Sequence, residues 1–334
     1  STEPVFFLLM NLAALCIYLT AANMIDAQTL QVGKLVAFME YLFHAMFSVM
    51  LFCMVFMLYP RASISAKRIM AVLNTETSIE NHPGNAQTDS GSGEHSVIFE
   101  HVDFVYPDGE EAVLKDISFS AKSGETVAFI GSTGSGKSSL IQLIPRFYDR
   151  ASGNIYIDGQ KIEDLDINAL RSKIGFVPQK ASLFEGSLRD NMKWGKEDAT
   201  DEEIYQALDI AQAREFVDQK EQGLDFRIEQ NGGNLSGGQK QRLTIARALV
   251  RKPEILILDD SASALDFATD ARLRKAIKEN TDNMTVFLVS QRVSTIRNAD
   301  HILVLDDGKI AGIGTHKELL RNCEVYKQIA ASQL

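Results

Sequence analysis

The chain combines GSTGSGKS at Gly131–Ser138 with LSGGQ at Leu235–Gln239, a pairing at a spacing that few proteins share. The first motif follows the strand-like run TVAFI and precedes the helix-forming run SSLIQLI. That order of strand, G-x-x-x-x-G-K-[ST] loop and helix is typical of a phosphate-binding loop. A glycine-rich turn without a ligand is the alternative, and the flanking strand and helix disfavour it.

The loop has the chemistry that a nucleoside triphosphate needs. Its glycines let backbone amides turn toward phosphates, and the helix that follows offers its positive N-terminus. Lys137 adds a point charge, and the Ser138 hydroxyl suits Mg²⁺. Further along, the apolar run Ile255–Leu258 ends in Asp259 and Asp260. Asp259 is predicted to orient a water on Mg²⁺ opposite the loop.

The motif LSGGQ permits two interpretations. Ser236 and Gln239 have the S-x-x-Q spacing of a capping box that opens the helix KQRLTIARALV. Gly237 and Gly238 are poor helix formers, however, and a phosphate that approaches bare backbone amides explains them better. We therefore expect a ligand-binding helix start here.

Strand-like and helical runs alternate after residue 97, which predicts an α/β core. The expected strands are Val97–Tyr106, Val113–Ser120, Thr126–Ile130, Asn154–Ile157, Ile174–Val177, Ile255–Leu258, Thr285–Val289 and Ile302–Leu305. Between Asn191 and Val250 helical signals dominate, and Thr200 and Glu203 have capping-box spacing. The sequence therefore predicts a helical insert within the α/β domain.

The first 60 residues have a different composition. Val5–Asn23 contains no charged residue, and Leu35–Tyr59 contains one acid, Glu40. At about 1.5 Å per residue each is long enough to cross a hydrocarbon layer of roughly 30 Å. A pair of buried core helices is the alternative, but such helices are rarely this long without a polar face.

Charge and cysteine usage exclude other classes. The net charge of -10 and the pI near 5.2 argue against a nucleic-acid partner. The 3 cysteines are too few and too scattered for a disulfide framework or a metal cluster.

Arg61, Lys67 and Arg68 follow the second apolar segment, so the positive-inside bias places that end in the cytoplasm. The first segment lacks the basic leader of a signal peptide, and the chain is expected to be a fragment of a longer protein.

These motifs together resemble the C-terminal part of a half-transporter of the ABC exporter family. The resemblance covers essentially the whole chain. It implies the last two transmembrane helices at residues 1–60, a stalk helix at 61–74, a linker at 75–96 and a nucleotide-binding domain at 97–334. The implied domain is a P-loop NTPase of ABC type, with a RecA-like core, an antiparallel β subdomain and a helical signature subdomain.

The resemblance also implies roles for individual residues. Tyr106 is the expected aromatic stacked on adenine, Gln179 the glutamine that links Mg²⁺ to the membrane domain, and Ser263–Asp266 the loop that crosses a dimer interface. The implied nucleotide-binding residues are Tyr106, Ser132, Thr133, Gly134, Ser135, Gly136, Lys137, Ser138, Ser139, Ser236, Gly237, Gly238 and Gln239. The implied Mg²⁺ ligands are Ser138, Gln179 and Asp259, and Asp260, Gln291 and Gln179 are the candidate catalytic residues.

Two positions depart from the family pattern. Where this chain has Asp260 and Gln291, the family has a glutamate and a histidine. A shortened side chain misplaces its charge, and a glutamine cannot carry a proton. The chain thus resembles the degenerate-site subunit of heterodimeric bacterial multidrug-type exporters, with slow hydrolysis at its own site and an intact LSGGQ that serves a second half-transporter. Such a subunit binds ATP and Mg²⁺, lies in the cell membrane with a cytoplasmic nucleotide-binding domain, and exports hydrophobic compounds such as drugs or lipids.

Some alternatives stay open. A regulatory or scaffolding subunit with structural ATP and no transport of its own also fits the two departures. Within the second apolar segment, Glu40 and His44 are spaced i, i+4, so they either line a translocation path or hold the helix bundle together. The methionines of this segment suit varied apolar cargo, but they equally suit packing or lipid contact.

Overall fold

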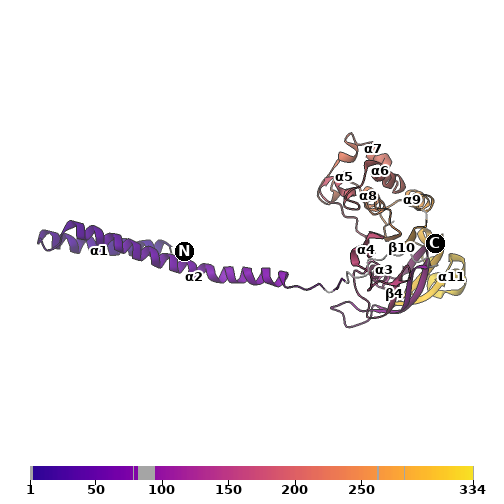
Figure 1. Cartoon of the computed structure of the whole chain (residues 1–334), viewed down its shortest axis with the longest axis horizontal. Coiled ribbons are helices and arrows are strands. Elements are labelled where there is room, and N and C mark those ends of the chain that lie inside the picture. The colour runs from indigo at the N-terminus through magenta and orange to yellow at the C-terminus, as the bar shows by residue number, and fades with distance from the viewer. Residues whose placement is uncertain (1–2, 78, 82–94, 262, 282, 334) are drawn as a thin grey trace. The chain divides into compact units, whose positions relative to one another are not determined.

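The computed structural model describes residues 3–77, 79–81, 95–261, 263–281 and 283–333 (Figure 1). The chain divides into two units, one up to Ser78 and one from Ile79 onward. The linker predicted over residues 75–96 falls largely outside the described residues.

The first unit is a pair of helices, α1 (Glu3–Asp26) and α2 (Val32–Leu73), which run antiparallel (Figure 1). Both are long and apolar enough to cross a membrane, with window hydropathies of 2.2 and 2.1. Nearly all of their described side chains are exposed. At about 1.5 Å per residue, α2 is roughly 60 Å long, which exceeds the thickness of a hydrocarbon layer. Residues 61–73, where the sequence predicts a stalk, belong to this same helix.

Glu40 and His44 lie on the exposed surface of α2. The Nδ1 atom of His44 lies 2.8 Å from the backbone oxygen of Glu40, one helical turn earlier. The imidazole therefore contacts the backbone of its own helix, while the Glu40 carboxylate has no hydrogen bond within the described chain.

The second unit is built on a six-stranded sheet with the order β12-β11-β3-β10-β9-β6. All neighbouring strands are parallel except the edge pair β11 and β12. Its strands are β3 (Thr126–Gly131), β6 (Ile174–Val177), β9 (Ile255–Asp259), β10 (Thr285–Val289), β11 (His301–Asp306) and β12 (Lys309–Gly314). Every residue of β9 and β10 is buried, as expected for a parallel sheet covered on both faces.

Alternate residues of these strands supply two cores. Phe129, Ile257 and Phe287 face the cluster that includes helix α3 (Lys137–Leu143) and a second sheet. Ala128 and Leu288 face the opposite cluster, which includes helices α8 (Gly237–Leu249), α9 (Phe267–Asn280) and α12 (Glu324–Ala331). The two-residue period of a strand thus places successive side chains in different cores.

The second sheet is antiparallel, with the order β2-β1-β4-β5. Its strands are β1 (His95–Phe104), β2 (Leu114–Lys122), β4 (Ser152–Ile157) and β5 (Gln160–Lys161). Phe119 of β2 joins it to the parallel sheet, with its ring centroid 5.7 Å from that of Phe129. Phe129 in turn stacks on Phe287 at 6.0 Å. This aromatic chain fixes the antiparallel sheet against the face that carries α3.

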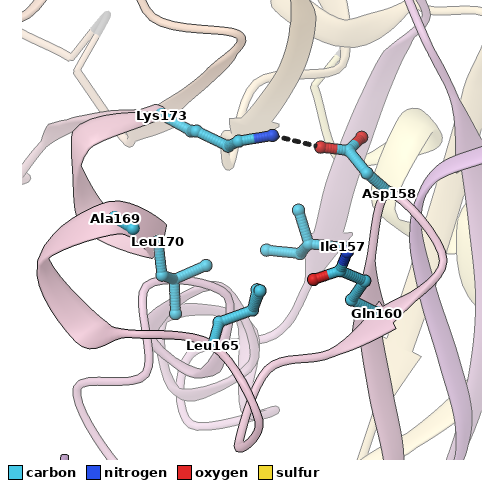
Figure 2. Close-up of a pocket in the computed structure, with 7 residues that line it drawn as sticks. All are labelled: Ile157, Asp158, Gln160, Leu165, Ala169, Leu170 and Lys173. Atoms are coloured by element: carbon cyan, nitrogen blue, oxygen red, sulfur yellow. Dashed lines mark hydrogen bonds and ion pairs between the residues drawn. The ribbon is translucent and has the colours of Figure 1, made fainter. Parts of the chain in front are cut away.

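A small pocket lies between the β4–β5 turn and helix α4 (Ile167–Ser172) (Figure 2). Its volume of about 10 Å³ leaves room for one water at most. Lys173 closes one side through an ion pair with Asp158 at 2.7 Å (Figure 2) and a second with Glu254 at 3.2 Å. The pocket is therefore a packing feature, and the ion pairs join the two sheets at this point.

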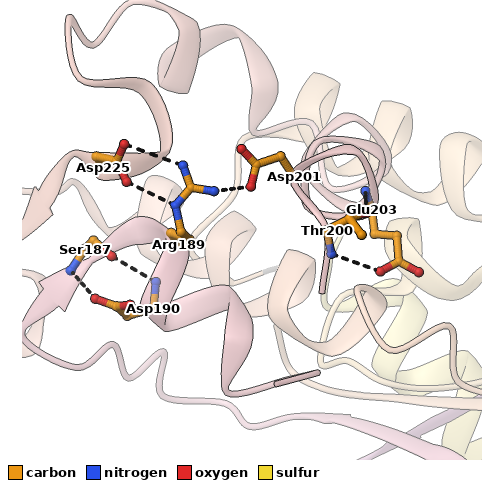
Figure 3. A network of polar contacts seen from close by, with 7 residues as sticks. All are labelled: Ser187, Arg189, Asp190, Thr200, Asp201, Glu203 and Asp225. Atoms are coloured by element: carbon orange, nitrogen blue, oxygen red, sulfur yellow. Dashed lines mark hydrogen bonds and ion pairs between the residues drawn. The ribbon is translucent and has the colours of Figure 1, made fainter. Parts of the chain in front are cut away.

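The helical insert comprises α5 (Leu188–Lys193), α6 (Asp201–Ile210), α7 (Arg214–Asp218) and α8. Capping boxes begin α5 at Ser187 and α6 at Thr200, and the second confirms the sequence prediction (Figure 3). Arg189 joins the segments, because its guanidinium contacts both Asp201 and Asp225 (Figure 3).

The remaining elements are short: β7 (Gly186–Ser187), β8 (Arg227–Ile228), α10 (Val293–Ile296), α11 (His316–Asn322) and the 3₁₀ turns Gly223–Asp225 and Gln230–Gly232. Each of the expected strands is confirmed to within a few residues. Strand β8 lies within the region Asn191–Val250, for which only helices were expected, and its partner β7 lies just before that region. Strands β5, β7 and β12 were also not predicted.

The aromatic chain gives a stability prediction. Replacing Phe287 by Ala removes a fully buried ring and leaves a cavity, so we expect the free energy of unfolding to fall by about 3–5 kcal/mol. Phe267→Ala is the control, because that ring is 62% exposed and its loss should cost less than about 0.5 kcal/mol. Urea unfolding in detergent, followed by circular dichroism, measures both. Equal losses for the two variants would contradict the packing described here.

Candidate functional site

The phosphate-loop motif lies between β3 and α3, as the sequence predicts. Gly134 and Gly136 have φ angles of +84° and +97°, which favour glycine. At Gly131 the constraint is steric, because an added Cβ would lie 2.1 Å from the backbone oxygen of Leu305. The loop conformation thus requires glycine at all three positions, for two different reasons.

Lys137 folds back over this loop. Its ammonium donates hydrogen bonds to the backbone oxygens of Gly131 at 2.9 Å and Ser132 at 2.6 Å, and to Ser135 Oγ at 3.2 Å. Burial lowers the pKa of Lys137, although the nearby charges of Asp260 and Asp259 act to raise it. The loop therefore already holds a buried cation among oxygen acceptors, and phosphate oxygens fit this environment.

Asp259 lies opposite the loop, at the end of β9. Ser138 Oγ donates to its Oδ1 atom at 3.2 Å. The carboxylate is 6% exposed, and burial raises its pKa above the ordinary value, with a further increase from the charge of Asp260. Hydrogen bonding to Ser138 and the charge of Lys137 oppose this shift without cancelling it. A hydroxyl and an electron-rich buried carboxylate side by side suit a divalent cation.

Asp260 and Gln179 come together next to this pair. Gln179 Nε2 donates to Asp260 Oδ2 at 3.3 Å. Burial raises the pKa of Asp260, and the Gln179 hydrogen bond and the charge of Arg292 act in the opposite direction. The backbone of Asp260 has a φ of +45°, and its N–H donates to Val289 O at 3.0 Å. Its carboxylate is thus held by a residue just beyond β6, and its backbone N–H by the last residue of β10.

Tyr106 lies beside the start of α3. Its hydroxyl is 2.8 Å from Ser139 Oγ, and its ring packs edge-on against Phe104 and Tyr148, with centroid distances of 4.7 and 5.1 Å. The ring is half-buried. The fold therefore brings Tyr106 next to the helix that follows the phosphate loop, although Ser139 lies 33 residues further along the chain. Its expected contact with adenine stays a prediction.

Gln291 follows β10 directly and is exposed. Its side chain makes no hydrogen bond to any other described residue. Since β10 lies between β3 and β9 in the sheet, Gln291 emerges at the same edge as the phosphate loop and Asp260. Arg292, which the sequence did not single out, donates from Nη2 to Ser263 O at 3.4 Å.

The LSGGQ motif forms the predicted capping box at the start of α8. Ser236 N donates to Gln239 Oε1 at 3.0 Å, and Gln239 N donates to Ser236 Oγ at 3.3 Å. A Cβ on Gly238 would lie 3.2 Å from Ala264 O. The loop Ser263–Asp266 (SALD) therefore passes close to the start of α8. The loop ends at Asp266, which caps α9 by accepting hydrogen bonds from Thr269.

The two motifs lie in different parts of the second unit. Helix α8 lies with α5 and α6, and α3 lies with the sheets (Figure 1). No hydrogen bond or ion pair connects Gly131–Ser138 with Leu235–Gln239 in the described ranges. One chain therefore presents a phosphate loop and a separate LSGGQ surface.

A cavity of about 330 Å³ lies between α9 and β10 and contains none of the predicted site residues. Of the cations on its wall, Arg274 is engaged with Asp270 at 2.9 Å and with Thr295 O at 2.7 Å. No cluster of three or more His, Cys, Asp or Glu side chains suited to a metal occurs among the described residues. A cation at Ser138 and Asp259 would therefore need ligand oxygens in addition to this pair.

Comparisons with known proteins agree with this geometry. Residues 114–263 match the model of the family described as ABC transporter. The chain is 45% identical over 332 residues to the ABC transporter ATP-binding protein YfiB of Bacillus subtilis (strain 168), covering 99% of this chain and 57% of YfiB. It is also 44% identical over 237 residues to a Staphylococcus aureus (strain NCTC 8325 / PS 47) protein named "Putative multidrug export ATP-binding/permease protein", covering 71% of this chain and 41% of that protein.

Among solved structures, a bacterial Atm1-family ABC exporter with ATP bound is similar, with a TM-score of 0.82 and 32% sequence identity. The similarity covers 98% of this chain and 57% of that one. The matched part of this chain thus corresponds to between 41% and 57% of the length of these relatives.

The buried carboxylate gives a prediction about pH. A carboxyl group with a raised pKa stabilises the fold below its unfolded pKa, and that contribution is lost as pH rises through the folded pKa. We therefore expect Asp259→Asn to raise the melting temperature of the nucleotide-free protein at pH 7, with a smaller gain near pH 4. Scanning fluorimetry in detergent with a chelator measures this.

The control is Asp108→Asn, which removes the same charge from an exposed turn and should change the melting temperature little. With Mg²⁺ and ATP added, the wild type should gain stability and Asp259→Asn should not. A lower melting temperature for nucleotide-free Asp259→Asn would show that the ionised carboxylate stabilises the fold.

Proposed function

Because the chain carries an ATP-binding domain of the ABC transporter family behind two apolar helices, we propose that it is part of the ATP-binding and permease subunit of an exporter. The observation that supports this most strongly is the site itself. Lys137, Ser138, Asp259, Asp260 and the backbone of the phosphate loop converge at one edge of the parallel sheet.

In this proposal the loop amides and Lys137 bind the phosphates of ATP, and Ser138 and Asp259 hold Mg²⁺ with the help of Gln179. The metal would neutralise phosphate charge, which is the chemistry that such a cation supplies. Lys137 exchanges its present backbone acceptors for phosphate oxygens. The cost of burying Asp259 as an anion is offset when a cation lies next to it.

We propose that hydrolysis at this site is slow. Asp260 takes the place of the family glutamate, and its shorter side chain is held back by Gln179 at 3.3 Å. A displacement of about 1 Å in a positioned reaction costs roughly 100-fold. Gln291 replaces a histidine and cannot carry a proton, and such acid-base assistance is typically worth about 10² to 10⁴-fold.

The second half of the proposal concerns a partner. LSGGQ is intact, caps α8 and is separate from this chain's own phosphate loop, so it is free to complete a site on another half-transporter. We propose a heterodimer in which the partner has the glutamate and the histidine that this chain lacks. Two half-transporters in one bilayer would then share two unequal ATP sites.

For the membrane part, we propose that α1 and α2 span the cell membrane and that the second half of α2 continues into the cytoplasm as a stalk. Hydrophobic compounds are the proposed cargo, which is consistent with the word "multidrug" in the name of the Staphylococcus aureus relative. Glu40 is exposed on α2, and its carboxylate has no hydrogen-bond partner among the described residues, so we assign it and His44 to the proposed translocation path.

Restoring the family residues should accelerate hydrolysis. We expect Asp260→Glu combined with Gln291→His to raise ATP turnover at this site by about 10²-fold or more, because both a longer carboxylate and a proton carrier return. ATPase assays of the purified chain in detergent measure this. The matched control, Asp260→Asn with Gln291→Ala, should show no increase in ATP turnover. If the wild type already hydrolyses ATP as fast as the restored variant, the proposal of slow hydrolysis is wrong.

The two sites of the assembled transporter should respond differently to loss of the phosphate-loop lysine. We expect Lys137→Ala to slow turnover of the complex severalfold, and the equivalent change in the partner to abolish it. Assays of ATP hydrolysis and cargo export on the same co-purified complexes test this. Export that continues unchanged after Lys137→Ala would favour the alternative function, a regulatory subunit whose ATP is structural.

A further inference from the structure

Gln333, beyond the end of α12, holds the backbone on both sides of Arg292. Its Nε2 atom donates to Gln291 O at 2.6 Å, and its Oε1 atom accepts from Val293 N at 2.8 Å. Both ends of the amide are engaged, so the contact specifies one orientation of the side chain. We call this pair of hydrogen bonds the C-terminal clamp.

Helix α12, which ends two residues before Gln333, is attached to the core. Tyr326 of α12 is fully buried, and its hydroxyl lies 2.7 Å from His316 Nδ1. Burial raises the pKa of Tyr326 to about 12, so the phenol is neutral at physiological pH. Helix α12 packs against β3 and β11, two strands of the parallel sheet. Gln333 therefore lies just beyond the end of a helix that is packed against the core.

The clamped segment begins at the candidate site. Val289, the last residue of β10, pairs with Phe129 of β3 and with Asp259 of β9. Ser290 N then donates to Phe129 O at 3.2 Å. On the far side of Gln291, Arg292 N donates to Ser290 Oγ at 3.0 Å. The backbone around Gln291 is thus tied to the sheet before it and to the clamp at and after it.

Gln291 itself depends on this backbone. Its side chain is exposed and forms no hydrogen bond with another described residue, so nothing but the main chain fixes where it points. The clamp bonds directly to the carbonyl of this residue. Loss of the clamp frees the carbonyl of Gln291 and the amide of Val293, and the segment then samples other conformations.

We propose that Gln333 is a positioning residue that holds Gln291 toward the terminal phosphate of ATP. The inference rests on the proposed function, in which Gln291 occupies the histidine position beside that phosphate. ADP lacks this terminal phosphate but has every other group of ATP that binds the site. The clamp therefore strengthens binding of ATP and leaves binding of ADP unchanged.

The test compares affinities for ATP and ADP, each with Mg²⁺, by displacement of a fluorescent ADP analogue from the purified chain in detergent. We expect Gln333→Ala to weaken ATP binding by about three- to tenfold, the range for one lost hydrogen-bonded constraint, with ADP binding within about twofold of wild type. Gln328→Ala is the matched control, because Gln328 is an exposed glutamine of α12, five residues before Gln333. It should change neither affinity.

Two further variants separate positioning from simple anchoring of the helix. In a Gln291→Ala background, Gln333→Ala should cause no additional loss of ATP affinity. Gln333→Glu keeps the acceptor for Val293 N–H but replaces the donor to Gln291 O by a carboxylate oxygen that repels this carbonyl, so its ATP affinity at neutral pH should fall at least as far as in Gln333→Ala. Hydrogen exchange at the Val293 amide should accelerate in Gln333→Ala and stay slow in Gln328→Ala.

Equal weakening of ATP and ADP by Gln333→Ala would show that the residue only anchors α12, and no effect on either would show that the clamp positions nothing. Lys137→Ala is measured in parallel to report on the proposed function. If Lys137→Ala abolishes ATP binding while Gln333→Ala changes neither affinity, only the proposal about Gln333 is wrong and the proposed function stands. If the wild type binds no ATP, both proposals are wrong.

Discussion

The parallel register of β3, β10 and β9 is the constraint on which the site depends. Pairing of Val289 with both Phe129 and Asp259 brings the phosphate loop, the two acids and the Gln291 segment to one edge of the sheet. A shift of one residue would exchange the two faces of a strand, so Phe287 would leave the aromatic core. Packing of the core and assembly of the site are therefore one requirement.

That edge gathers buried charge in advance of any ligand. Lys137, Asp259 and Asp260 lie within a region where burial disfavours the charged form of each, and the attraction between Lys137 and the two acids compensates only in part. A ligand that combines phosphate with a metal ion would bring a negative charge next to Lys137 and a positive charge next to the two acids. The large buried core of the unit offsets the unfavourable free energy of burying these charges. Such unfavourable burial is typical of sites that are organised before the ligand binds.

The fold class was predictable because its signals are local. Strands β3, β9 and β10 are apolar runs with clear ends, and the capping boxes at Thr200 and Ser236 lie within four residues of sequence. Strand β12 was missed because Gly312 and Gly314 hide its pattern. The contacts of Tyr106 with Ser139 and of Gln333 with Gln291 join distant segments, and no spacing rule reports such pairs.

Vanadate trapping with a photoreactive ATP analogue tests most directly the proposal that the two ATP sites of the assembled transporter are unequal. Vanadate captures nucleotide only where hydrolysis has occurred. In the co-purified complex, the account predicts that the trapped label attaches to the partner, in the site that Ser236 of this chain completes. Label trapped on this chain beside Lys137, in equal or greater amount, would contradict it.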